Sequence, residues 1–512
     1  MQKRLLLLTN ADRGQANVFL AAADALLRCQ IDVAIHFASF DALESEVRSL
    51  WQNDQDAASS AKKSVSFHKI RGLSMAEGLR EHFARSQTPC REDYFPESFL
   101  APLSTGNSMR AICDAVSIFV PYDGPQLEQV YSSICDIITT VSPDLVLVDA
   151  LMTAGLTACY QMDVNFHCLS PNSIKEFAGP SQPRAATLWK FPALFSGYQY
   201  PVRAHLIPIN IFLILYAVYQ FRTSRSIRDV QKWMVTRKNA QLRTPLDLLR
   251  DRPPKLRILV GCLPELDFPV LIPQHVTPCG PILRRSRDVK DADADLAAWL
   301  TRGPVIYINL GSICRTSEDQ ACELARAIVT VLRTTPSATS YRVVWKLKKQ
   351  GSYQVEEKES RLFNILAQDF KSDLVRIYDW LQPEPTALLQ SGNIACSVHH
   401  GGANSYFESA SSGVPQVVLP QWTDCYDYAQ RVEHLGIGRI GSRLSCPLWD
   451  ATELAGELLH VLVGPQADHI KGRAMEMSHI CRRNGNGASK VVDFIAEELA
   501  LDATKVSTMH DA

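Results

Sequence analysis

The chain alternates short apolar runs with longer segments in which apolar positions recur at helical spacing. Short apolar runs are typical of buried strands, and strands that alternate with helices form parallel sheets. The strands expected in the first half are 4–9, 32–37, 65–69, 145–149 and 164–168, with helices at 15–29, 41–51, 124–140 and 151–161. Those expected in the second half are 305–310, 342–347, 374–377, 394–398 and 416–419. The pattern predicts an α/β protein with two doubly wound parallel-sheet (Rossmann-like) domains.

A segment dense in Arg and Asp, 282–294, separates the two groups of strands. We expect a linker here, because domain boundaries fall in polar segments that few contacts cross. The predicted organisation is an N-terminal domain at 1–282, a linker at 283–298, a C-terminal domain at 299–480 and a helical segment at 481–500.

One strand-turn-helix unit in the second half carries most of the candidate chemistry. The apolar run 394–398 leads into His399, His400 and two glycines, and a helical segment then runs to Gly413. A strand, a tight glycine turn and a helix N-terminus form an anion site, because free backbone N–H groups and the helix dipole point at a bound phosphate. His400, Asn404 and Ser405 can donate to phosphate oxygens, and Glu408 lies one helical turn further on the same face.

The composition narrows the class of protein. Lys and Arg (53) nearly balance Asp and Glu (54), and the chain has no basic block, so nothing points to a nucleic-acid partner. The 14 cysteines show no CxxC spacing, and several lie in apolar runs, as expected for reduced core thiols in the cytosol. No His and Cys cluster indicates a metal site. The apolar run at 5–8 is too short for a signal peptide.

The longest apolar stretch, 205–221, has two interpretations. It falls short of the roughly 20 residues that span a bilayer, and it contains Pro208 and Asn210. The favoured interpretation is a buried helix that lines the pocket of a lipophilic ligand in the first domain. The alternative is an interfacial membrane anchor, with Trp189, Tyr200 and the basic segment 222–228 at its flanks.

The segment from Tyr378 to Asp427 resembles the C-terminal signature of UDP-glycosyltransferases. The residues that carry the resemblance are Trp380-Leu-Gln382-Pro, His400-Gly-Gly402-Ala-Asn404-Ser405-Tyr-Phe-Glu408, Gly413-Val-Pro415 and Asp424-Cys425. It extends to 305–312, where a strand runs into Gly311 and Ser312, and to the N-terminal strand and glycine turn, so that it covers most of the chain. The segment Gly-Gln-Ala-Asn-Val at 14–18 is similar to the corresponding segment in a fungal branch of the family.

The resemblance implies a GT-B fold, in which two such domains face each other and the last helix returns to the first. It implies that the first domain binds the acceptor and the second the UDP-sugar. Trp380 would stack on uracil, with Gln382 near the base and ribose and Glu408 on the ribose hydroxyls. The diphosphate would meet His400, Asn404, Ser405 and the turns at Gly311, Ser312 and Gly402. Asp424 would bind the sugar, and Cys425 replaces the usual Gln with a weak hydrogen-bond partner. UDP-glucose is the default donor.

The residue that activates the acceptor is the open question. Gln15 stands where the family has the histidine that deprotonates the acceptor hydroxyl, and an amide cannot take that proton. Asp149 stands where the family keeps the carboxylate that orients this histidine, and we expect it to act as the base. The alternatives are His36, or an acceptor acidic enough to need little help.

The sequence therefore predicts an inverting, UDP-dependent hexosyltransferase that acts on a hydroxyl or carboxyl of a lipophilic small molecule, such as a secondary metabolite. The UDP-sugar is its co-substrate, and no cofactor or metal is expected. Gln15 and Cys425 together suggest a first alternative, a catalytically impaired nucleotide-sugar-binding protein. A membrane-associated sterol or lipid glycosyltransferase is the second. We expect a cytoplasmic protein. Under the second alternative, it would also contact a membrane peripherally through 205–221.

Overall fold

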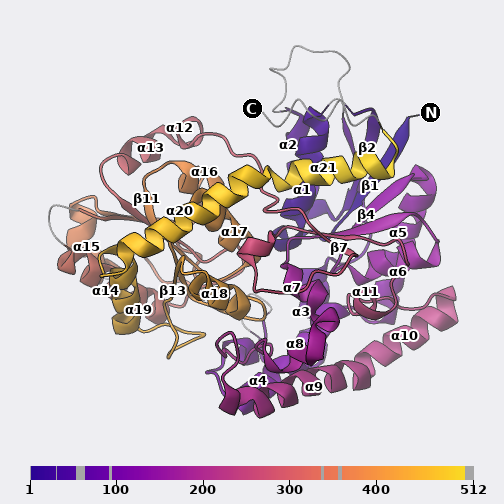
Figure 1. Ribbon diagram of the computed structural model, residues 1–512, viewed down its shortest axis with the longest axis horizontal. Helices are drawn as coiled ribbons and strands as arrows, with labels where there is room; N and C mark the ends of the chain where they lie inside the picture. The colour runs from indigo at the N-terminus through magenta and orange to yellow at the C-terminus, as the bar shows by residue number, and fades with distance from the viewer. Residues whose placement is uncertain are drawn as a thin grey trace.

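The computed structural model describes residues 2–29, 31–52, 64–90, 95–335, 340–355 and 360–501. They form two α/β domains that lie side by side, with the N-terminal domain on the right of Figure 1 and the C-terminal domain on the left. Each domain is built on one sheet in which all paired strands are parallel. The predicted α/β class with two parallel sheets is confirmed.

The N-terminal sheet has the strand order β3-β2-β1-β4-β5-β6-β7. Its strands are β1 Lys3–Leu8, β2 Val33–Ser39, β3 Val65–Lys69, β4 Leu145–Asp149, β5 Phe166–Ser170, β6 Ile258–Val260 and β7 Val276–Pro278. The helices of this domain are α1 Arg13–Arg28, α2 Glu44–Gln52, α3 Met75–Arg85, α4 Thr105–Phe119, α5 Gly124–Val141, α6 Thr153–Gln161, α7 Ile174–Ala178, α8 Ala186–Trp189, α9 Ile207–Thr223, α10 Arg225–Lys238 and α11 Asp247–Arg250.

The C-terminal sheet has the strand order β10-β9-β8-β11-β12-β13. Its strands are β8 Val305–Asn309, β9 Arg342–Lys346, β10 Val375–Tyr378, β11 Ile394–His399, β12 Gln416–Val418 and β13 Gly438–Ile440. The helices that follow β7 are α12 Val289–Ala292, α13 Ala294–Leu300, α14 Glu318–Thr334, α15 Arg361–Lys371, α16 Pro385–Gln390, α17 Ala403–Ser412, α18 Cys425–His434, α19 Ala451–Leu462, α20 Ala467–Asn484 and α21 Gly487–Glu498.

Strand β1 shows why the strand signal is strong in this chain. Its last four residues are leucines with no exposed surface. Leu5 and Leu7 pack in a cluster with Phe19 of α1, whereas Leu6 and Leu8 pack on the other face with Ile134 of α5. A parallel strand covered on both faces has apolar residues at every position, so it appears as a continuous apolar run.

Three strands, β6, β7 and β13, were not predicted. Each is three residues long, and a run of that length shows no period in the sequence. The segment 283–298 contains α12 and the start of α13.

The last two helices span both domains, as the yellow ribbon in Figure 1 shows. Helix α20 packs against α17 of the C-terminal domain, and α21 packs against α1. Val492 and Ile495 of α21 share an apolar cluster with Phe19 of α1 and Leu5 of β1. The end of the chain therefore completes the core of the N-terminal domain.

The apolar stretch 205–221 forms α9, which lies along the outer edge of the N-terminal domain with α10 (Figure 1). The interpretation as a buried helix is wrong. Of the residues of α9, Asn210 and Leu213 are buried, whereas Phe212, Leu215 and Tyr219 are 45%, 53% and 59% exposed. Because α9 is apolar on all sides, its sequence does not reveal which side the protein covers.

Asn210 explains how a polar residue is accommodated inside α9. Its side chain accepts a hydrogen bond from the Ala193 N–H at 2.8 Å and donates to the Leu188 and Phe191 carbonyls at 2.9 Å. These bonds attach α9 to the preceding segment.

Within the described residues, the helical stretch Ala204–Lys238 is long and apolar enough to cross a membrane by length and composition, and 11% of its apolar window is buried.

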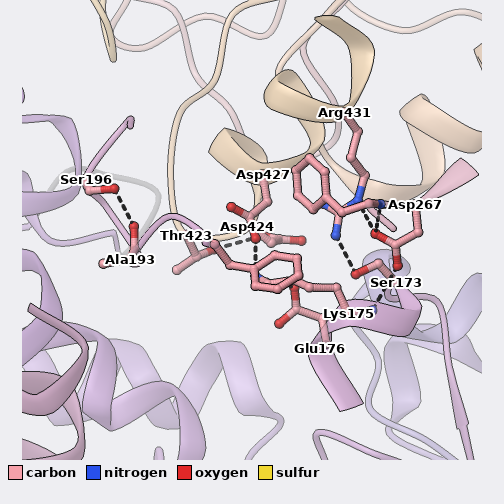
Figure 2. A network of polar contacts seen from close by, with 12 residues as sticks. Ser173, Lys175, Glu176, Ala193, Ser196, Asp267, Thr423, Asp424, Asp427 and Arg431 are labelled. Atoms are coloured by element: carbon pink, nitrogen blue, oxygen red, sulfur yellow. Dashed lines mark hydrogen bonds and ion pairs between the residues drawn. The ribbon is translucent and has the colours of Figure 1, made fainter. Parts of the chain in front are cut away.

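Buried charges hold the two domains together at the junction drawn in Figure 2. Arg431 of α18 and Asp267 of the N-terminal domain both have fully buried side chains, and Arg431 Nε donates to Asp267 Oδ1 at 2.7 Å. Arg431 Nη2 also donates to Ser173 Oγ at 2.8 Å. Lys175, two residues after Ser173, forms an ion pair with Asp427 of α18. In both ion pairs, a charge of one domain is therefore paired with an opposite charge of the other domain.

Replacing Arg431 by Met tests this junction. The change leaves the Asp267 carboxylate buried without its countercharge, so the free energy of unfolding should fall by about 3–5 kcal/mol. The double variant D267L/R431M should regain much of this loss, because it leaves no buried charge unpaired. Urea denaturation measures both variants.

The matched control is R302A, which removes an ion pair whose side chains are 49% and 42% exposed. Exposed pairs contribute little to stability, so R302A should unfold almost like the parent protein. The account of the junction is contradicted if R431M is no less stable than R302A.

Candidate functional site

A cavity of about 280 Å³ lies between the two domains and is lined by residues of both. The N-terminal domain contributes Arg13, Gly14 and Gln15 from the start of α1, just after β1 ends. The C-terminal domain contributes the turns that follow β8 and β11. The cavity therefore lies at the carboxyl ends of parallel strands, where ligands bind in open α/β sheets.

The structure brings most of the predicted site residues to this cavity. Those that line it are Gln15, Gly311, Ser312, Trp380, Gln382, His400, Gly402, Asn404, Ser405, Glu408 and Asp424. Asp149 and Cys425 do not line it.

Of two adjacent histidines, His400 faces the cavity and His399 belongs to the core. His399 Nε2 lies 2.8 Å from Gln416 Oε1, and its Nδ1 accepts from the Gly401 N–H at 3.1 Å. His400 has a buried Nδ1 without a hydrogen-bond partner. Burial, together with His399 and Lys346, lowers the pKa of His400 to about 3, so its ring is neutral at neutral pH.

Two glycines make room for the ring of His400. A Cβ on Gly311 would lie 2.6 Å from its Cε1, and one on Gly402 would lie 2.5 Å from its Nε2. Gly311 also has a φ of +86°, which favours glycine. The two glycine turns thus place one imidazole between β8 and β11.

The N-terminus of α17 opens onto the cavity. Gly402 is its N-cap residue, Ala403, Asn404 and Ser405 form the first turn, and that turn contains no acidic residue. The free N–H groups of a first turn and the helix dipole attract an anion. Asn404 also reaches across the cleft, where its Nδ2 donates to the Arg13 carbonyl at 3.4 Å.

Trp380 lines the cavity, and the residue is 52% exposed. Two cations lie over its ring: Lys346 Nζ is 4.3 Å from the ring centroid, and the Arg13 guanidinium carbon is 5.1 Å from it. Burial, Lys348 and Arg13 lower the pKa of Lys346 to about 8. The cavity therefore offers a flat ring next to positive charge.

Two carboxyl groups, those of Glu408 and Asp424, line the same cavity. Burial and the charge of Glu384 raise the pKa of Glu408 to about 8. Burial also raises the pKa of Asp424, to about 6, with Glu176 and Asp427 adding to the shift, while Thr423 Oγ1 donates to its Oδ1 at 2.8 Å. At neutral pH Glu408 therefore holds a proton and can both donate to and accept from a hydroxyl, whereas Asp424 is ionised and accepts.

Cys425 has a packing role in this structure. It is fully buried, and its carbonyl oxygen would lie 2.7 Å from a Cβ on Gly401, whose φ is +89°. The close approach of Cys425 to Gly401 holds the start of α18 against the glycine turn. Of this pair, Asp424 is the residue that lines the cavity.

The residues considered for activation of the acceptor differ in their burial and in whether they line the cavity. Asp149 is fully buried at the end of β4, where it accepts from Asn10 Nδ2 at 3.0 Å and from the Leu151 N–H at 2.8 Å. His36 lies in β2, with its Nδ1 2.9 Å from His68 Nε2, and does not line the cavity. Gln15 does line the cavity.

Sequence reasoning missed two residues that line the cavity, Arg13 and Lys346. Lys346 ends a buried strand and Arg13 follows another, and polar residues at carboxyl strand ends are the signal that could have identified them. In the described residues, no group of His, Cys, Asp and Glu is arranged to hold a metal ion.

Comparisons with known proteins agree with this geometry. A family model described as Erythromycin biosynthesis protein CIII-like, C-terminal domain, matches residues 370–469. Glycosyltransferase sdnJ of Sordaria araneosa is 31% identical over 504 residues, which are 94% of this chain and 95% of that protein. UDP-glycosyltransferase 74C1 of Arabidopsis thaliana is 27% identical over 221 residues, or 40% of this chain and 43% of that protein.

Solved structures share the fold at low sequence identity. A UDP-glucosyltransferase from Polygonum tinctorium superposes with a TM-score of 0.60 at 15% identity, covering 97% of this chain and 98% of its own. UGT2 of Phytolacca americana gives a TM-score of 0.58 at 14% identity, with 97% and 99% covered. The two facing parallel sheets are thus the GT-B fold. With similarity to sdnJ over nearly its whole length, the chain belongs to the UDP-glycosyltransferases of family 1.

Proposed function

We propose that this glycosyltransferase moves a hexose, glucose by default, from a UDP-sugar to a hydroxyl or carboxyl group of a lipophilic small molecule. The observation that carries the proposal is the single cavity that joins Trp380, the N-terminus of α17 with His400, and the carboxyl groups of Glu408 and Asp424. These groups match a base, a diphosphate, a ribose and a hexose in turn. The relative from Polygonum tinctorium is described as capable of glucosylating indoxyl, a small acceptor of this kind.

In the proposed complex, uracil stacks on Trp380 and displaces the cations that lie over its ring. Gln382 lies near the base and ribose, and Glu408 accepts from the ribose hydroxyls. The diphosphate lies against Asn404, Ser405, and the turns at Gly311, Ser312 and Gly402. Asp424 accepts from the sugar hydroxyls. His400 is neutral, and so it donates one N–H to the diphosphate without adding charge.

The reaction is a direct displacement that inverts the anomeric carbon. As the acceptor oxygen bonds to the anomeric carbon, the bond from that carbon to the β-phosphate oxygen breaks and the electron pair passes to UDP. A hydroxyl acceptor also gives up its proton, which leaves to water. The α17 N-terminus and the nearby Lys346 and Arg13 stabilise the negative charge that develops on the leaving group. We expect these protein groups to supply the positive charge at the leaving group, with no metal or cofactor.

A catalytically impaired binding protein is the main competitor. An inactive site has no need for carboxyl groups held beside the helix N-terminus, and both Glu408 and Asp424 remain in the cavity. Buried carboxyl groups reduce stability unless a ligand satisfies them. Their presence favours an active enzyme.

The direct test incubates the protein with a panel of nucleotide sugars and lipophilic acceptors, and detects products by mass spectrometry. We expect a product carrying one hexose and the release of UDP. The H400A variant should fold normally and turn over about 10²–10³-fold more slowly, because it lacks a donor to the leaving group. Binding of UDP without transfer to any acceptor would support the impaired binding protein instead.

A second prediction concerns the uracil. Trp380→Ala should weaken UDP binding by about 1–3 kcal/mol, or about 5- to 150-fold, because it removes the stacking surface. Calorimetry measures the affinity. Trp189→Ala is the matched control, since Trp189 is a partly exposed Trp (39%) that does not line the cavity. Equal UDP affinity in both variants would show that Trp380 does not hold the base.

We further propose that the enzyme works at an anionic membrane surface, where a lipophilic acceptor is concentrated. Phe212, Leu215 and Tyr219 are exposed at positions three and four apart and so form one stripe on α9. The chain from 200 to 238 contains seven basic residues and one acidic residue, Asp229. An exposed apolar stripe next to basic side chains is the pattern of a helix that lies in a membrane interface.

Sedimentation with lipid vesicles tests this surface. The protein should pellet with phosphatidylcholine vesicles that contain phosphatidylserine, and less in high salt. The variant F212S/L215S/Y219S should stay in solution, whereas the control L444S, at an 89% exposed leucine of the C-terminal domain, should still pellet. If the protein pellets neither with these vesicles nor with pure phosphatidylcholine vesicles, or is a dimer that the triple variant dissociates, then α9 does not bind lipid.

A further inference from the structure

Two arginines line the cavity between the domains and share one carboxylate. They are Arg13, at the start of α1, and Arg284, in the segment after β7. Arg13 Nη2 donates to Glu46 Oε1 at 2.8 Å, and Arg284 Nη1 donates to Glu46 Oε2 at 2.9 Å. Glu46 belongs to α2, and its side chain is 19% exposed. One carboxylate of the N-terminal domain therefore holds both guanidinium groups at the cavity through charge-assisted hydrogen bonds.

Arg13 covers the face of Trp380 that borders the cavity. Its guanidinium carbon lies 5.1 Å from the centroid of the Trp380 ring, and both residues line the cavity. The backbone of Arg13 is also tied to the C-terminal domain, since its carbonyl accepts from Asn404 Nδ2 at 3.4 Å. A cation of the N-terminal domain is thus held above the ring of the C-terminal domain on which we propose that uracil stacks.

The separation of Arg13 from Trp380 determines what a base must do to enter. Stacked groups lie about 3.5 Å apart, so a flat base between a guanidinium and an indole needs about 7 Å from one to the other. The present separation of 5.1 Å is short of this by about 2 Å. The Arg13 side chain is 41% exposed, so it has room to withdraw by this amount and remain in the cleft.

Lys346, the other cation over Trp380, suits a different part of the nucleotide. Its Nζ donates to the Gly311 carbonyl at 3.3 Å, beside a turn where we propose that the diphosphate lies. An ammonium group is a compact charge without a flat face, whereas a guanidinium is planar and stacks on rings. Proteins bind unpaired bases by stacking them on aromatic rings and on guanidinium planes. Arg13 therefore fits the second face of the base, and Lys346 fits the phosphates.

We propose that Arg13 is a base-binding residue that closes the uracil site from the opposite domain, with Glu46 as its positioning residue. The inference rests on the proposed function. Uracil lies between Trp380 and the Arg13 guanidinium, which withdraws from the indole to admit the base and then stacks on its outer face. Glu46 holds the guanidinium over the base. The nucleotide thus contacts both domains, and its binding site is complete only when they lie together.

Replacing Arg13 by Met or by Lys tests the stack. Both variants should bind UDP about 5- to 30-fold more weakly, because Met removes a desolvated cation–π contact and Lys keeps the charge without the plane. Uridine, which has no phosphate, should lose affinity by a similar factor. Calorimetry measures UDP binding, and an NMR titration measures the weaker binding of uridine. The matched control R48M, which removes a 65% exposed arginine of α2 that does not line the cavity, should bind both ligands like the parent protein.

Glu46 is tested through the same neutral ligand. Uridine carries no charge, so the loss of a carboxylate affects its binding only through the placement of Arg13. E46A should weaken uridine binding, and the double variant R13M/E46A should bind uridine no more weakly than R13M, because Glu46 acts through Arg13. Losses that add in the double variant would overturn the positioning role of Glu46.

The outcomes separate this inference from the proposed function. Arg13 does not bind the base if R13M binds uridine like the parent protein, or if R13K binds UDP as tightly as the parent does. Its charge alone would then act, on the diphosphate. If W380A weakens UDP binding while R13M leaves it unchanged, the uracil site stands and the role of Arg13 is rejected. A parent protein that binds no UDP would reject the proposed function itself, and this inference with it.

Discussion

The ion pair between Arg431 and Asp267 fixes where the two domains meet. Both side chains are fully buried, so separating the domains, or sliding one past the other, would leave each charge without a partner in a dry interface. The stacking of the Arg431 guanidinium over Phe268, 4.4 Å from its ring centroid, restricts the pair further. Tyr406 of α17 adds a hydrogen bond from its Oη to the Leu266 carbonyl at 2.8 Å. A cleft whose width is set in this way can hold residues of both domains at fixed separations.

The same junction reaches the candidate site through α18. Arg431 and Asp427 lie on this helix, and Asp424 is its N-cap residue (Figure 2). The charges of Glu176 and Asp427 contribute to the raised pKa of Asp424, so the residue proposed to bind sugar is electrostatically part of the domain junction. Helix α17 is tied to the N-terminal domain in parallel, through Tyr406 and Asn404. Both helices that present the proposed donor-binding residues are therefore held by contacts across the cleft.

The sequence was most informative where local chemistry determines structure. Continuous apolar runs located the long parallel strands, and the glycine turn before α17 located the anion site, because both signals lie within a few neighbouring residues. The sequence placed His400 at the glycine turn, and its ring lines the cavity, whereas the hydrogen bond of His399 to Gln416 in the core could not be predicted because it joins two strands. Lys346 and Arg13 come together over Trp380 from different domains, and no local pattern encodes that. The exposed side of α9 depends on what α4 covers.

The account as a whole depends on the nucleotide lying between Trp380 and the N-terminus of α17. The most direct measurement is a crystal structure of the protein with UDP. The account predicts the uracil ring stacked on Trp380 with Lys346 and Arg13 displaced from the ring. It also predicts the ribose at Glu408, and the diphosphate within hydrogen-bond distance of His400 and the first turn of α17. UDP bound outside this cavity, or bound with Trp380 still covered by the two cations, would contradict it.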